Sequence, residues 1–211
     1  MNDLDIAKIC FKLYDDNPLD ADWDNLWPHD GGFAARKRVG DVDVVIWRGS
    51  TTALDWIDDL DFEPVDYPVF GKVHAGFLKG VSAVWDQVDA TLGAKVIISG
   101  HSLGAAHALL HAARHEVRSK RPQRVVVMGS PRPGFQKLAD LLGPVSIASY
   151  KNGDDPVTMV PPTLPSWPYV PPRDFIPLDV APELGDSWGV FARHRWTLYL
   201  QGIEAYIKDA R

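Results

Sequence analysis

The residues best suited to chemistry lie near the middle of the chain, in the pentapeptide Gly100-His101-Ser102-Leu103-Gly104. A serine hydroxyl is a weak nucleophile, so it needs a neighbouring base and a backbone that presents it to a substrate. The Gly-x-Ser-x-Gly pattern supplies that backbone, because its glycines let a strand and a helix come close around a serine at a sharp turn. The flanking residues 95–99 and 105–118 are typical of a buried strand and an Ala- and Leu-rich helix. We therefore predict that Ser102 is a nucleophile, with a purely structural turn as the alternative.

Histidines in and after this motif could also carry chemistry. His101 cannot turn back to the hydroxyl of its own neighbour, so we interpret it as a packing residue. His107, His111 and His115 recur every four residues on the predicted helix, a spacing that can bind a metal ion. No Glu follows His107 as in zinc proteases, and no third kind of ligand is evident. We predict a partly solvated helix face here, with neither a metal nor an organic cofactor.

Hydrophobic periodicity predicts strands and helices in alternation along most of the chain. The predicted strands cover residues 42–47, 72–74, 95–99, 124–128 and 145–150. The predicted helices cover residues 4–14, 77–92, 105–118, 135–142 and 196–208. Strands that alternate with helices imply right-handed crossover connections, so we predict an α/β fold with a mainly parallel central sheet.

Two segments depart from this alternation. Residues 156–182 hold 9 of the chain's 17 prolines, so we predict an extended, loop-rich layer over residues 156–193. Residues 51–61 mix apolar and acidic side chains at a spacing that suits one or two turns of amphipathic helix. The 211 residues suit a single domain that contains both segments.

The overall composition narrows the class of protein. Hydrophobic residues make up 45% and charged residues 24%, which allows a buried core and is unlike a disordered chain. The net charge of −6 and the lack of a basic cluster argue against nucleic acid as a partner. Cys10 is the only cysteine, so we expect a buried thiol and no intrachain disulfide.

The start of the chain and the length of its apolar runs indicate whether a secretion signal or a membrane span is expected. Met1-Asn2-Asp3-Leu4-Asp5 lacks the basic start and the apolar run of a secretory signal. No stretch approaches the roughly 20 apolar residues of a membrane span. We expect a soluble protein of a reducing compartment, cytoplasmic in the form given, while a removed leader or another route of release stays open. Nothing in the sequence predicts an oligomeric state.

Four blocks of sequence and a weaker fifth stand out together, in a fixed order. They are Trp47-Arg48-Gly49-Ser50, Trp56-Ile57-Asp58-Asp59-Leu60, Val73-His74-Ala75-Gly76-Phe77-Leu78, the nucleophile motif continued by Ala105-Ala106, and Asp155-Pro156-Val157 leading to Pro161-Pro162. Jointly they resemble the class 3 lipases, the family of the triacylglycerol lipases of filamentous fungi, over roughly residues 30–200. The resemblance implies an α/β-hydrolase fold, with helices on both sides of the sheet and a short lid segment.

The resemblance also implies roles for particular residues. Ser102 would be the nucleophile, His194 the base that takes its proton, and Asp155 the carboxylate that orients the base. Their order along the chain, Ser then Asp then His, is that of the α/β-hydrolases. The backbone N–H groups of Ser50 and Leu103 would form the oxyanion hole, although Ser50 could be only a turn residue.

The aspartate has several competitors. Asp154 directly precedes Asp155 at the predicted end of a strand, where an acidic residue can simply cap a turn. More distant alternatives lie in the proline-rich layer, at Asp174, Asp179 and Asp186.

The base has competitors too. His29 and His74 both precede the nucleophile, and the resemblance makes His74 a structural residue, so His194 is preferred. Arg48 is expected to anchor a loop through hydrogen bonds and not to touch a substrate.

The implied activity is hydrolysis of a carboxylic ester, an acylglycerol or another lipid ester, through an acyl-enzyme and without a metal or cofactor. A phospholipase A1 and a short-chain carboxylesterase are alternatives with the same chemistry, and a catalytically silent binding protein on the same fold is an alternative without it. Ala105 stands where many family members carry a second glycine, which should alter packing only. The disulfides of the secreted fungal members have no counterpart here, so their extracellular role is not implied.

Residues 51–61 are expected to form a short lid over the site, because they directly follow Ser50. Leu54, Trp56 and Ile57 would contact the substrate, while the acidic side chains of the segment face water. The same apolar side could meet a lipid surface transiently when the lid opens. The alternative is a fixed surface helix without gating.

Overall fold

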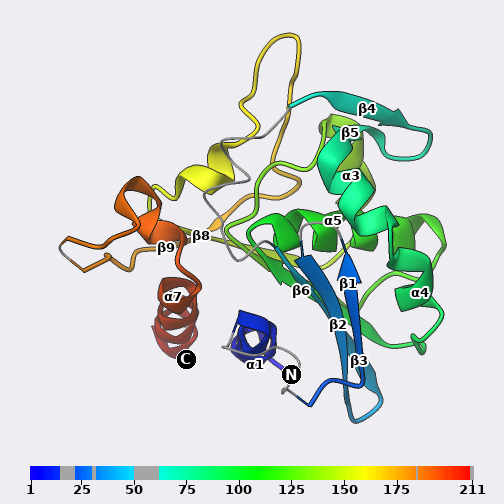
Figure 1. The fold of residues 1–211 in the computed structure, drawn as a ribbon, viewed down its shortest axis with the longest axis horizontal. Helices are drawn as coiled ribbons and strands as arrows, with labels where there is room; N and C mark the ends of the chain where they lie inside the picture. The colour runs from blue at the N-terminus through cyan, green and yellow to red at the C-terminus, as the bar shows by residue number, and fades with distance from the viewer. Residues whose placement is uncertain (15–21, 30–31, 50–61, 184, 210–211) are drawn as a thin grey trace.

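The computed structural model describes residues 1–14, 22–29, 32–49, 62–183 and 185–209 (Figure 1). Its centre is a seven-stranded sheet in the order β1-β2-β3-β6-β7-β8-β9. The strands are β1 (Asn25–His29), β2 (Gly32–Val39), β3 (Val42–Arg48), β6 (Val96–His101), β7 (Arg124–Met128), β8 (Ile147–Asn152) and β9 (Ile176–Leu178). Pairing is antiparallel between β1, β2 and β3 and parallel between the remaining neighbours, so the predicted mainly parallel sheet is confirmed.

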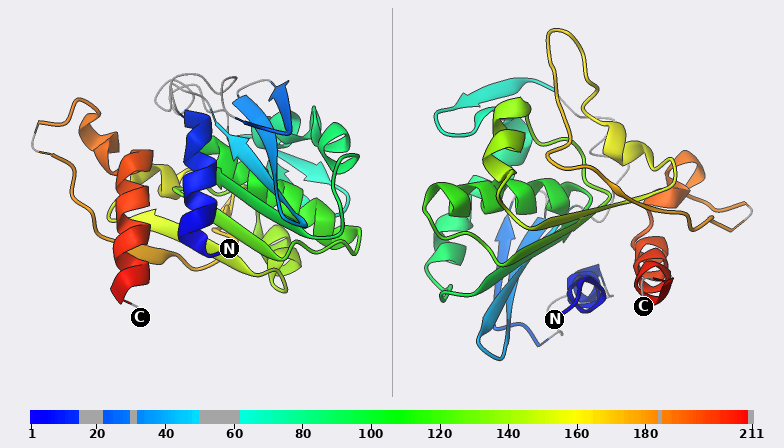
Figure 2. Two further views of the ribbon diagram at one scale, coloured as in Figure 1. Left: turned by 90° about the horizontal axis from the view of Figure 1, so that it is seen from below. Right: turned by 180° about the vertical axis from the view of Figure 1, so that it is seen from behind.

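Helices cover both faces of this sheet (Figure 2). One face carries α3 (Ala75–Ser82), α4 (Trp85–Asp89), α5 (Leu103–Val117) and α6 (Gln136–Leu142). The other face carries α1 (Asp3–Phe11) and α7 (Trp196–Asp209), which lie side by side. The short 3-10 helices are η1 (Lys12–Tyr14), η2 (Pro156–Met159) and η3 (Gly189–His194), and a separate hairpin pairs β4 (Pro64–Tyr67) with β5 (Gly71–His74).

The sheet separates two hydrophobic cores. Side chains alternate along β3, so Val45 and Trp47 pack under α5, whereas Val44 and Ile46 pack under α1 and α7. All six residues of β6 are buried, as expected for a central parallel strand covered by helices on both faces. This arrangement holds the carboxyl end of β6, where the nucleophile motif begins, rigidly between two layers.

Each strand and helix predicted among the described residues has a counterpart, but residues 77–92 form two helices and not one. The first, α3, ends at Ser82, and Val84 takes a non-helical backbone conformation (φ −131°, ψ −8°) before α4 begins. Phe77, Val81 and Val88 from the two helices enter the same core. The apolar spacing is therefore the same for one helix or two, which is why periodicity could not detect the break.

Several strands were not predicted. Strand β1 is only five residues long and contains Pro28, and strand β2 carries Arg36 and Lys37 in succession, so the alternation of apolar and polar residues is weak in both. Strand β9 lies inside the proline-rich layer and contains Pro177, which an edge strand tolerates because one of its sides forms no ladder bonds.

The predicted lid, residues 51–61 with Leu54, Trp56 and Ile57, lies outside the described residues, and so does Ser50. Over the ranges that are described, no helix is both long and apolar enough to cross a membrane.

Candidate active site

The turn after β6 places Ser102 in an uncommon conformation. Its backbone angles are φ 60° and ψ −133°, a region that side-chain-bearing residues rarely adopt and that costs free energy. The Ser102 N–H donates to the carbonyl oxygen of Met128 at the end of β7, and α5 begins at the next residue. The serine is thus held at the apex of a strand–turn–helix unit, as the Gly-x-Ser-x-Gly pattern predicts.

The two glycines of the motif are required by close backbone contact. A methyl group on Gly100 would lie 2.2 Å from the carbonyl oxygen of Gly104, and one on Gly104 would lie 2.0 Å from that of Trp47. Either contact is far inside van der Waals distance. The first turn of α5 therefore lies directly against both β6 and β3, and any side chain at these positions would push the serine out of place.

Asp155 lies just beyond β8 and caps η2. Its Oδ1 accepts from the Val157 N–H at 3.0 Å, and its Oδ2 accepts from His194 Nδ1 at 2.7 Å and from the Tyr199 hydroxyl. Burial alone would raise the pKa of this carboxyl, but the charge and hydrogen bond of His194 and the other donors outweigh it, so the pKa lies below its usual range. Asp155 is therefore a buried, ionised acceptor.

His194 ends η3, one residue short of the start of α7, and is fully buried. Because a carboxylate only accepts, the bond to Asp155 places a proton on Nδ1 and leaves Nε2 as the nitrogen that can take another. Burial, followed by the charge of Asp155, holds the pKa of Tyr199 well above its usual value, so its hydroxyl stays a donor. The base is thus fixed in one tautomer.

Among Ser102, Asp155 and His194, two buried polar atoms form no hydrogen bond within the described part of the chain: the Ser102 hydroxyl oxygen and His194 Nε2. Such atoms are rare in folded proteins, because an unmade bond costs about 1–3 kcal/mol. They are also the two atoms between which a nucleophilic serine must pass its proton. The Ser102 hydroxyl and His194 Nε2 are therefore both available for the proton transfer that acyl transfer needs.

Gly129, the residue after β7, allows the serine and the base to share this space. Its φ is +56°, and a methyl group there would lie 2.7 Å from Cε1 of His194 and 3.1 Å from Oδ2 of Asp155. Ser102 is bonded to the preceding residue, Met128, so the nucleophile and the base both adjoin this corner. A side chain at residue 129 would displace the imidazole.

The oxyanion hole can be followed only in part, because Ser50 lies outside the described residues. Leu103 is the first residue of α5, and a first-turn N–H has no partner inside its own helix. Nearby, the Tyr14 hydroxyl donates to the carbonyl oxygen of His101 at 3.2 Å and accepts from the Gly49 N–H at 3.3 Å. Tyr14 thus ties the end of β3 to the end of β6, on either side of the expected oxyanion position.

The competing aspartates lie elsewhere. Asp154 has a largely exposed side chain paired with Arg193 at 2.8 Å. Asp179 pairs with the same arginine, Asp186 pairs with Arg195, and Asp174 is exposed.

His74 and Arg48 do not join the site either. His74 caps α3 through a bond from the Phe77 N–H, and His29 ends β1. Buried Arg48 donates to the carbonyl oxygen of Leu13 at 2.5 Å, the loop-anchoring contact that was expected.

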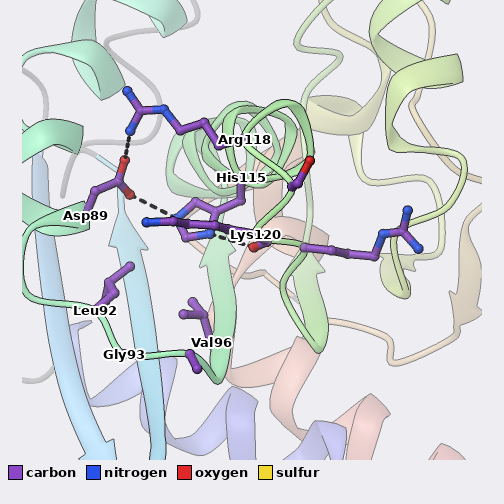
Figure 3. Close-up of a pocket in the computed structure, with 10 residues that line it drawn as sticks. Asp89, Leu92, Gly93, Val96, His115, Arg118 and Lys120 are labelled. Carbon is purple, nitrogen blue, oxygen red and sulfur yellow. Dashed lines mark hydrogen bonds and ion pairs between the residues drawn. The ribbon is translucent and has the colours of Figure 1, made fainter.

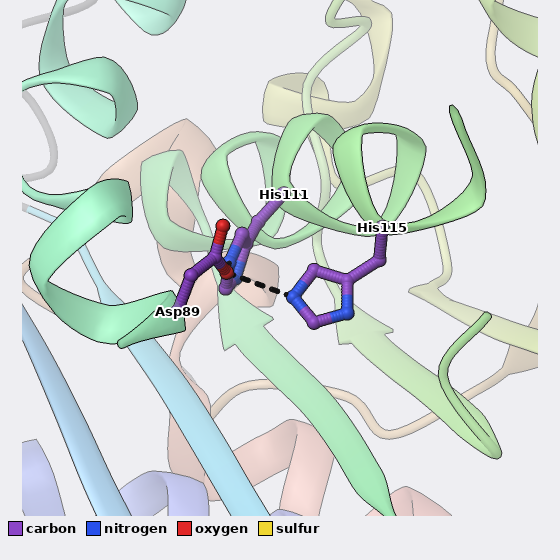
Figure 4. A group of neighbouring side chains, drawn as sticks. All are labelled: Asp89, His111 and His115. Atoms are coloured by element: carbon purple, nitrogen blue, oxygen red, sulfur yellow. Dashed lines mark hydrogen bonds and ion pairs between the residues drawn. The ribbon is translucent and has the colours of Figure 1, made fainter. Parts of the chain in front are cut away.

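The prediction that His107, His111 and His115 form a partly solvated face is wrong, because all three are at most 3% exposed. Asp89 at the end of α4 accepts from His111 Nε2 at 2.8 Å and from His115 Nε2 at 2.9 Å (Figure 4). The three groups could present one ligand atom each to a metal ion, since these atoms lie within 4.8 Å of one another. The acidic partner comes from another helix, so the spacing along α5 could not reveal it.

The hydrogen bonds of this cluster already use the ring nitrogens that a metal ion would need as ligands. Trp47 Nε1 donates to His111 Nδ1 at 3.2 Å, so the proton of His111 is on Nε2, the atom that a metal would need. His115 faces the Lys120 carbonyl oxygen through Nδ1 and Asp89 through Nε2, so both of its ring nitrogens already have a partner. Arg114 and Arg118 also bond to Asp89, and their charges oppose a dication.

Next to this cluster lies a cavity of about 720 Å³, lined by His115, Arg118 and the start of β6 (Figure 3). It opens at the amino ends of the parallel strands, whereas Ser102 lies at their carboxyl ends. In open α/β sheets substrates bind at the carboxyl ends. The cavity is therefore separate from the candidate active site.

Sequence reasoning missed Gly129 and Tyr199, which lie against His194 and Asp155. A signal was available for Tyr199, because it lies three residues after Trp196 and four before Ile203 on the predicted buried face of the last helix. No signal marked Gly129, which matters only because β7 ends beside His194.

Comparison with known proteins shows likeness to lipases. The model of the family described as lipase (class 3) matches residues 44–164. A lipase of Rhizomucor miehei is 36% identical over 132 residues, 56% of this chain and 36% of the relative. A chloroplastic phospholipase A(1) of Arabidopsis thaliana is 33% identical over 157 residues, 59% of this chain and 35% of the relative.

Solved structures extend the likeness to the fold. The crystal structure of a lipase from Rhizopus microsporus var. chinensis superposes with a TM-score of 0.64 at 27% identity, covering 84% of this chain and 73% of that one. The α/β-hydrolase fold implied by the motif blocks is confirmed. The chain spans only about a third to a half of the length of the curated relatives it matches.

Proposed function

Because this chain belongs to the class 3 lipase family, we propose that it hydrolyses carboxylic esters of lipids, with Ser102 as the nucleophile. One observation carries the proposal: the hydrogen bond from His194 to Asp155 leaves Nε2 of the base without a partner among the described residues. The Ser102 hydroxyl is in the same state. These are the two atoms that exchange a proton in a Ser-His-Asp triad, and no other described residue occupies either of them.

The reaction follows from these positions. Ser102 Oγ attacks the ester carbonyl carbon while His194 Nε2 takes the hydroxyl proton, and the carbonyl oxygen becomes an oxyanion. The N–H of Leu103 stabilises that charge, together with Ser50 as its second donor. His194 then gives its proton to the departing alcohol, which leaves an acyl-enzyme. Water, deprotonated by the same nitrogen, then attacks the acyl carbon. The bond to Ser102 Oγ breaks as Nε2 returns the proton to that oxygen, which releases the acid and regenerates the enzyme.

Asp155 and Tyr199 act on the base and not on the substrate. The ionised carboxylate holds the His194 ring in its Nδ1–H tautomer and stabilises the positive charge that forms during each transfer. The Tyr199 hydroxyl donates to the same carboxylate oxygen and keeps it in place.

The lipid part of the proposal is supported by exposed apolar side chains on the segments that hold the triad. Met159 on η2, which begins next to Asp155, is 50% exposed. Val190 on η3, which ends at His194, is 79% exposed. Burying such side chains against acyl chains is favourable by about 1.5–3 kcal/mol each when complete. We therefore place transient contact with a lipid interface on this side of the molecule.

Phospholipase A1 activity is a second candidate, favoured by the likeness to the plant phospholipase. Both candidates use the same triad, so only the substrate distinguishes them. A panel of emulsified triacylglycerol, phosphatidylcholine vesicles and p-nitrophenyl esters of increasing chain length separates a lipase from a phospholipase and from a short-chain esterase.

The direct test of the chemistry is labelling by a fluorophosphonate, followed by intact mass and peptide mapping. We expect one adduct on Ser102 and none on Ser102→Ala, whose ester hydrolysis should fall by several powers of ten while the fold persists. Ser130→Ala is the matched control, since Ser130 is also buried but bonds to a main-chain carbonyl. An adduct on another residue, or an active Ser102→Ala enzyme, would refute the assignment.

A further inference from the structure

The histidine inside the nucleophile motif has no role in the chemistry above, yet it contacts the base directly. His101 ends β6 and is 3% exposed. Its Nε2 lies 2.9 Å from the main-chain carbonyl oxygen of His194, and the two rings stack with centroids 4.6 Å apart and an interplanar angle of 25°. His101 therefore touches both the backbone and the ring of the base.

This hydrogen bond determines the protonation of His101. The carbonyl oxygen can only accept, so Nε2 carries the proton. Nδ1 forms no hydrogen bond to any described residue, so nothing there holds a second proton. Burial, and then the neighbouring His194, keep the pKa of His101 well below its ordinary value. His101 is a neutral Nε2–H tautomer, the opposite of the Nδ1–H tautomer of His194.

The surroundings of the stacked pair explain why a neutral ring is suitable. His194 faces Asp155 and Tyr199 on its other sides. His101 is flanked edge-on by Phe11, Tyr14 and Tyr199. Among these contacts the one negative charge, Asp155, lies against His194. A cation at His101 would oppose the imidazolium that forms on His194 during catalysis, whereas a neutral ring does not.

We propose that His101 is a positioning residue that holds the base in register with the nucleophile, an inference that rests on the proposed ester hydrolysis. His101 and Ser102 are consecutive residues. The hydrogen bond from His101 Nε2 to the His194 carbonyl oxygen therefore connects the base to the residue next to the nucleophile. Asp155 fixes the rotation of the His194 ring, and His101 fixes the position of its backbone. Displacing a catalytic group by about 1 Å can cost 10²-fold in rate.

Two substitutions separate the contributions of the hydrogen bond and the stacked ring. His101→Phe keeps a ring against His194 but removes the donor, and His101→Gln keeps an N–H at a similar reach but removes the ring. With a soluble p-nitrophenyl ester, we expect His101→Phe to lower kcat by about 10²-fold with little change in KM, since the substrate is not touched. His101→Gln should recover most of the lost kcat.

His115→Gln is the matched control. It also replaces a buried, hydrogen-bonded histidine, but its partners are Asp89 and the Lys120 carbonyl, away from the triad. We expect it to lower the thermal midpoint while kcat per folded molecule stays at the wild-type value. A purely structural His101 would behave in the same way.

A spectroscopic measurement keeps the proposal testable if the phenylalanine variant does not fold. In wild-type protein labelled with ¹⁵N-histidine, His101 should give a neutral Nε2–H signal that does not change where free histidine titrates. The low-field Nδ1 proton of His194 should move in His101→Gln and stay in place in His115→Gln. An His101 that titrates normally, or a His101→Phe enzyme with wild-type kcat, would overturn the positioning role. Failure of the hydrolase proposal itself would show differently, as an unlabelled Ser102 in an inactive wild type.

Discussion

Two aspartate–histidine groups lie at opposite ends of α5, and they differ in what they leave unbonded. Near the start of α5, Asp155 accepts from His194, Tyr199 and the Val157 N–H. Near its end, Asp89 accepts from two histidines and two arginines, His111, His115, Arg114 and Arg118. In both groups the hydrogen bonds outweigh burial and hold the pKa of the carboxyl below its usual range.

The difference lies in the second nitrogen of each imidazole. His111 and His115 use both ring nitrogens, toward Trp47, Lys120 and Asp89. His194 uses only Nδ1, and its Nε2 forms no bond to another described residue. A fully bonded cluster stabilises the fold, whereas an unfilled nitrogen beside a strained serine is available for chemistry. The comparison teaches that an Asp–His pair does not by itself mark the candidate site, which also needs an unbonded Nε2 on the histidine and an unbonded serine hydroxyl.

The largest effect should come from removing the orienting carboxylate. Asp155→Asn can no longer hold His194 in the Nδ1–H tautomer, so we expect kcat to fall by about 10⁴-fold. Asp154 is exposed and paired with Arg193, so Asp154→Asn should lower kcat only slightly. Steady-state kinetics on a soluble ester measure both. The reverse order of losses would mean that Asp154 belongs to the triad.

The same change in the other group should act on stability alone. Asp89→Asn leaves two buried histidines without their anionic partner and leaves buried Arg114 with only the exposed Asp86, so we expect unfolding to become easier by about 3–5 kcal/mol. Urea unfolding at neutral pH measures this loss. The kcat of the folded fraction should stay at the wild-type value, and a large loss of kcat would instead show that the cluster participates in the reaction.

The two groups were not equally predictable from the sequence. Ser102 is recognisable because the serine, its glycines and the flanking strand and helix are contiguous, so the local sequence contains the whole turn. Asp155 and Asp154 are neighbours with the same chemistry, and only the turn after β8 directs one into the core and the other to solvent. The Asp89 cluster joins two helices, and its packing is decided by long-range contacts that residue spacing does not encode.

The fold shows the same limit. Residues 124–128 form a strand with the predicted bounds, because an uninterrupted Val-rich run has one stable environment, the centre of a sheet. The helix predicted over residues 77–92 is broken at Val84, since one helix and two give the same apolar spacing. Periodicity identifies a buried face, and tertiary packing decides where an element ends.

A smaller effect should appear in the pH dependence of stability. Burial is the main cause that lowers the pKa of His111 to about 4, from 6.5 in an unfolded chain. Between these values the unfolded chain binds more protons, so His111 stabilises the fold above pH 6.5 and loses that contribution as the pH falls toward 4. The loss reaches roughly 3 kcal/mol. Denaturant unfolding of the wild type and of His111→Gln measures it, and an equally steep slope in both would assign the dependence to another group.

The smallest expected effect is that of zinc, which tests whether the Asp89 cluster is completed by protons. A site with three ligands would bind Zn²⁺ and raise stability by about 2.7 kcal/mol at a hundredfold excess over its dissociation constant. Here His111 Nε2 carries its proton because Trp47 donates to the other nitrogen, and two arginines bond to the shared carboxylate. Chelator-treated protein should therefore show no shift in thermal midpoint when Zn²⁺ is added, in the wild type and in His115→Gln alike. A saturable rise in the wild type that is lost in His115→Gln would make the cluster a metal site. The Asp89 cluster would then be a metal-binding site, and the Asp155–His194 group at the other end of α5 would differ from it by serving acyl transfer.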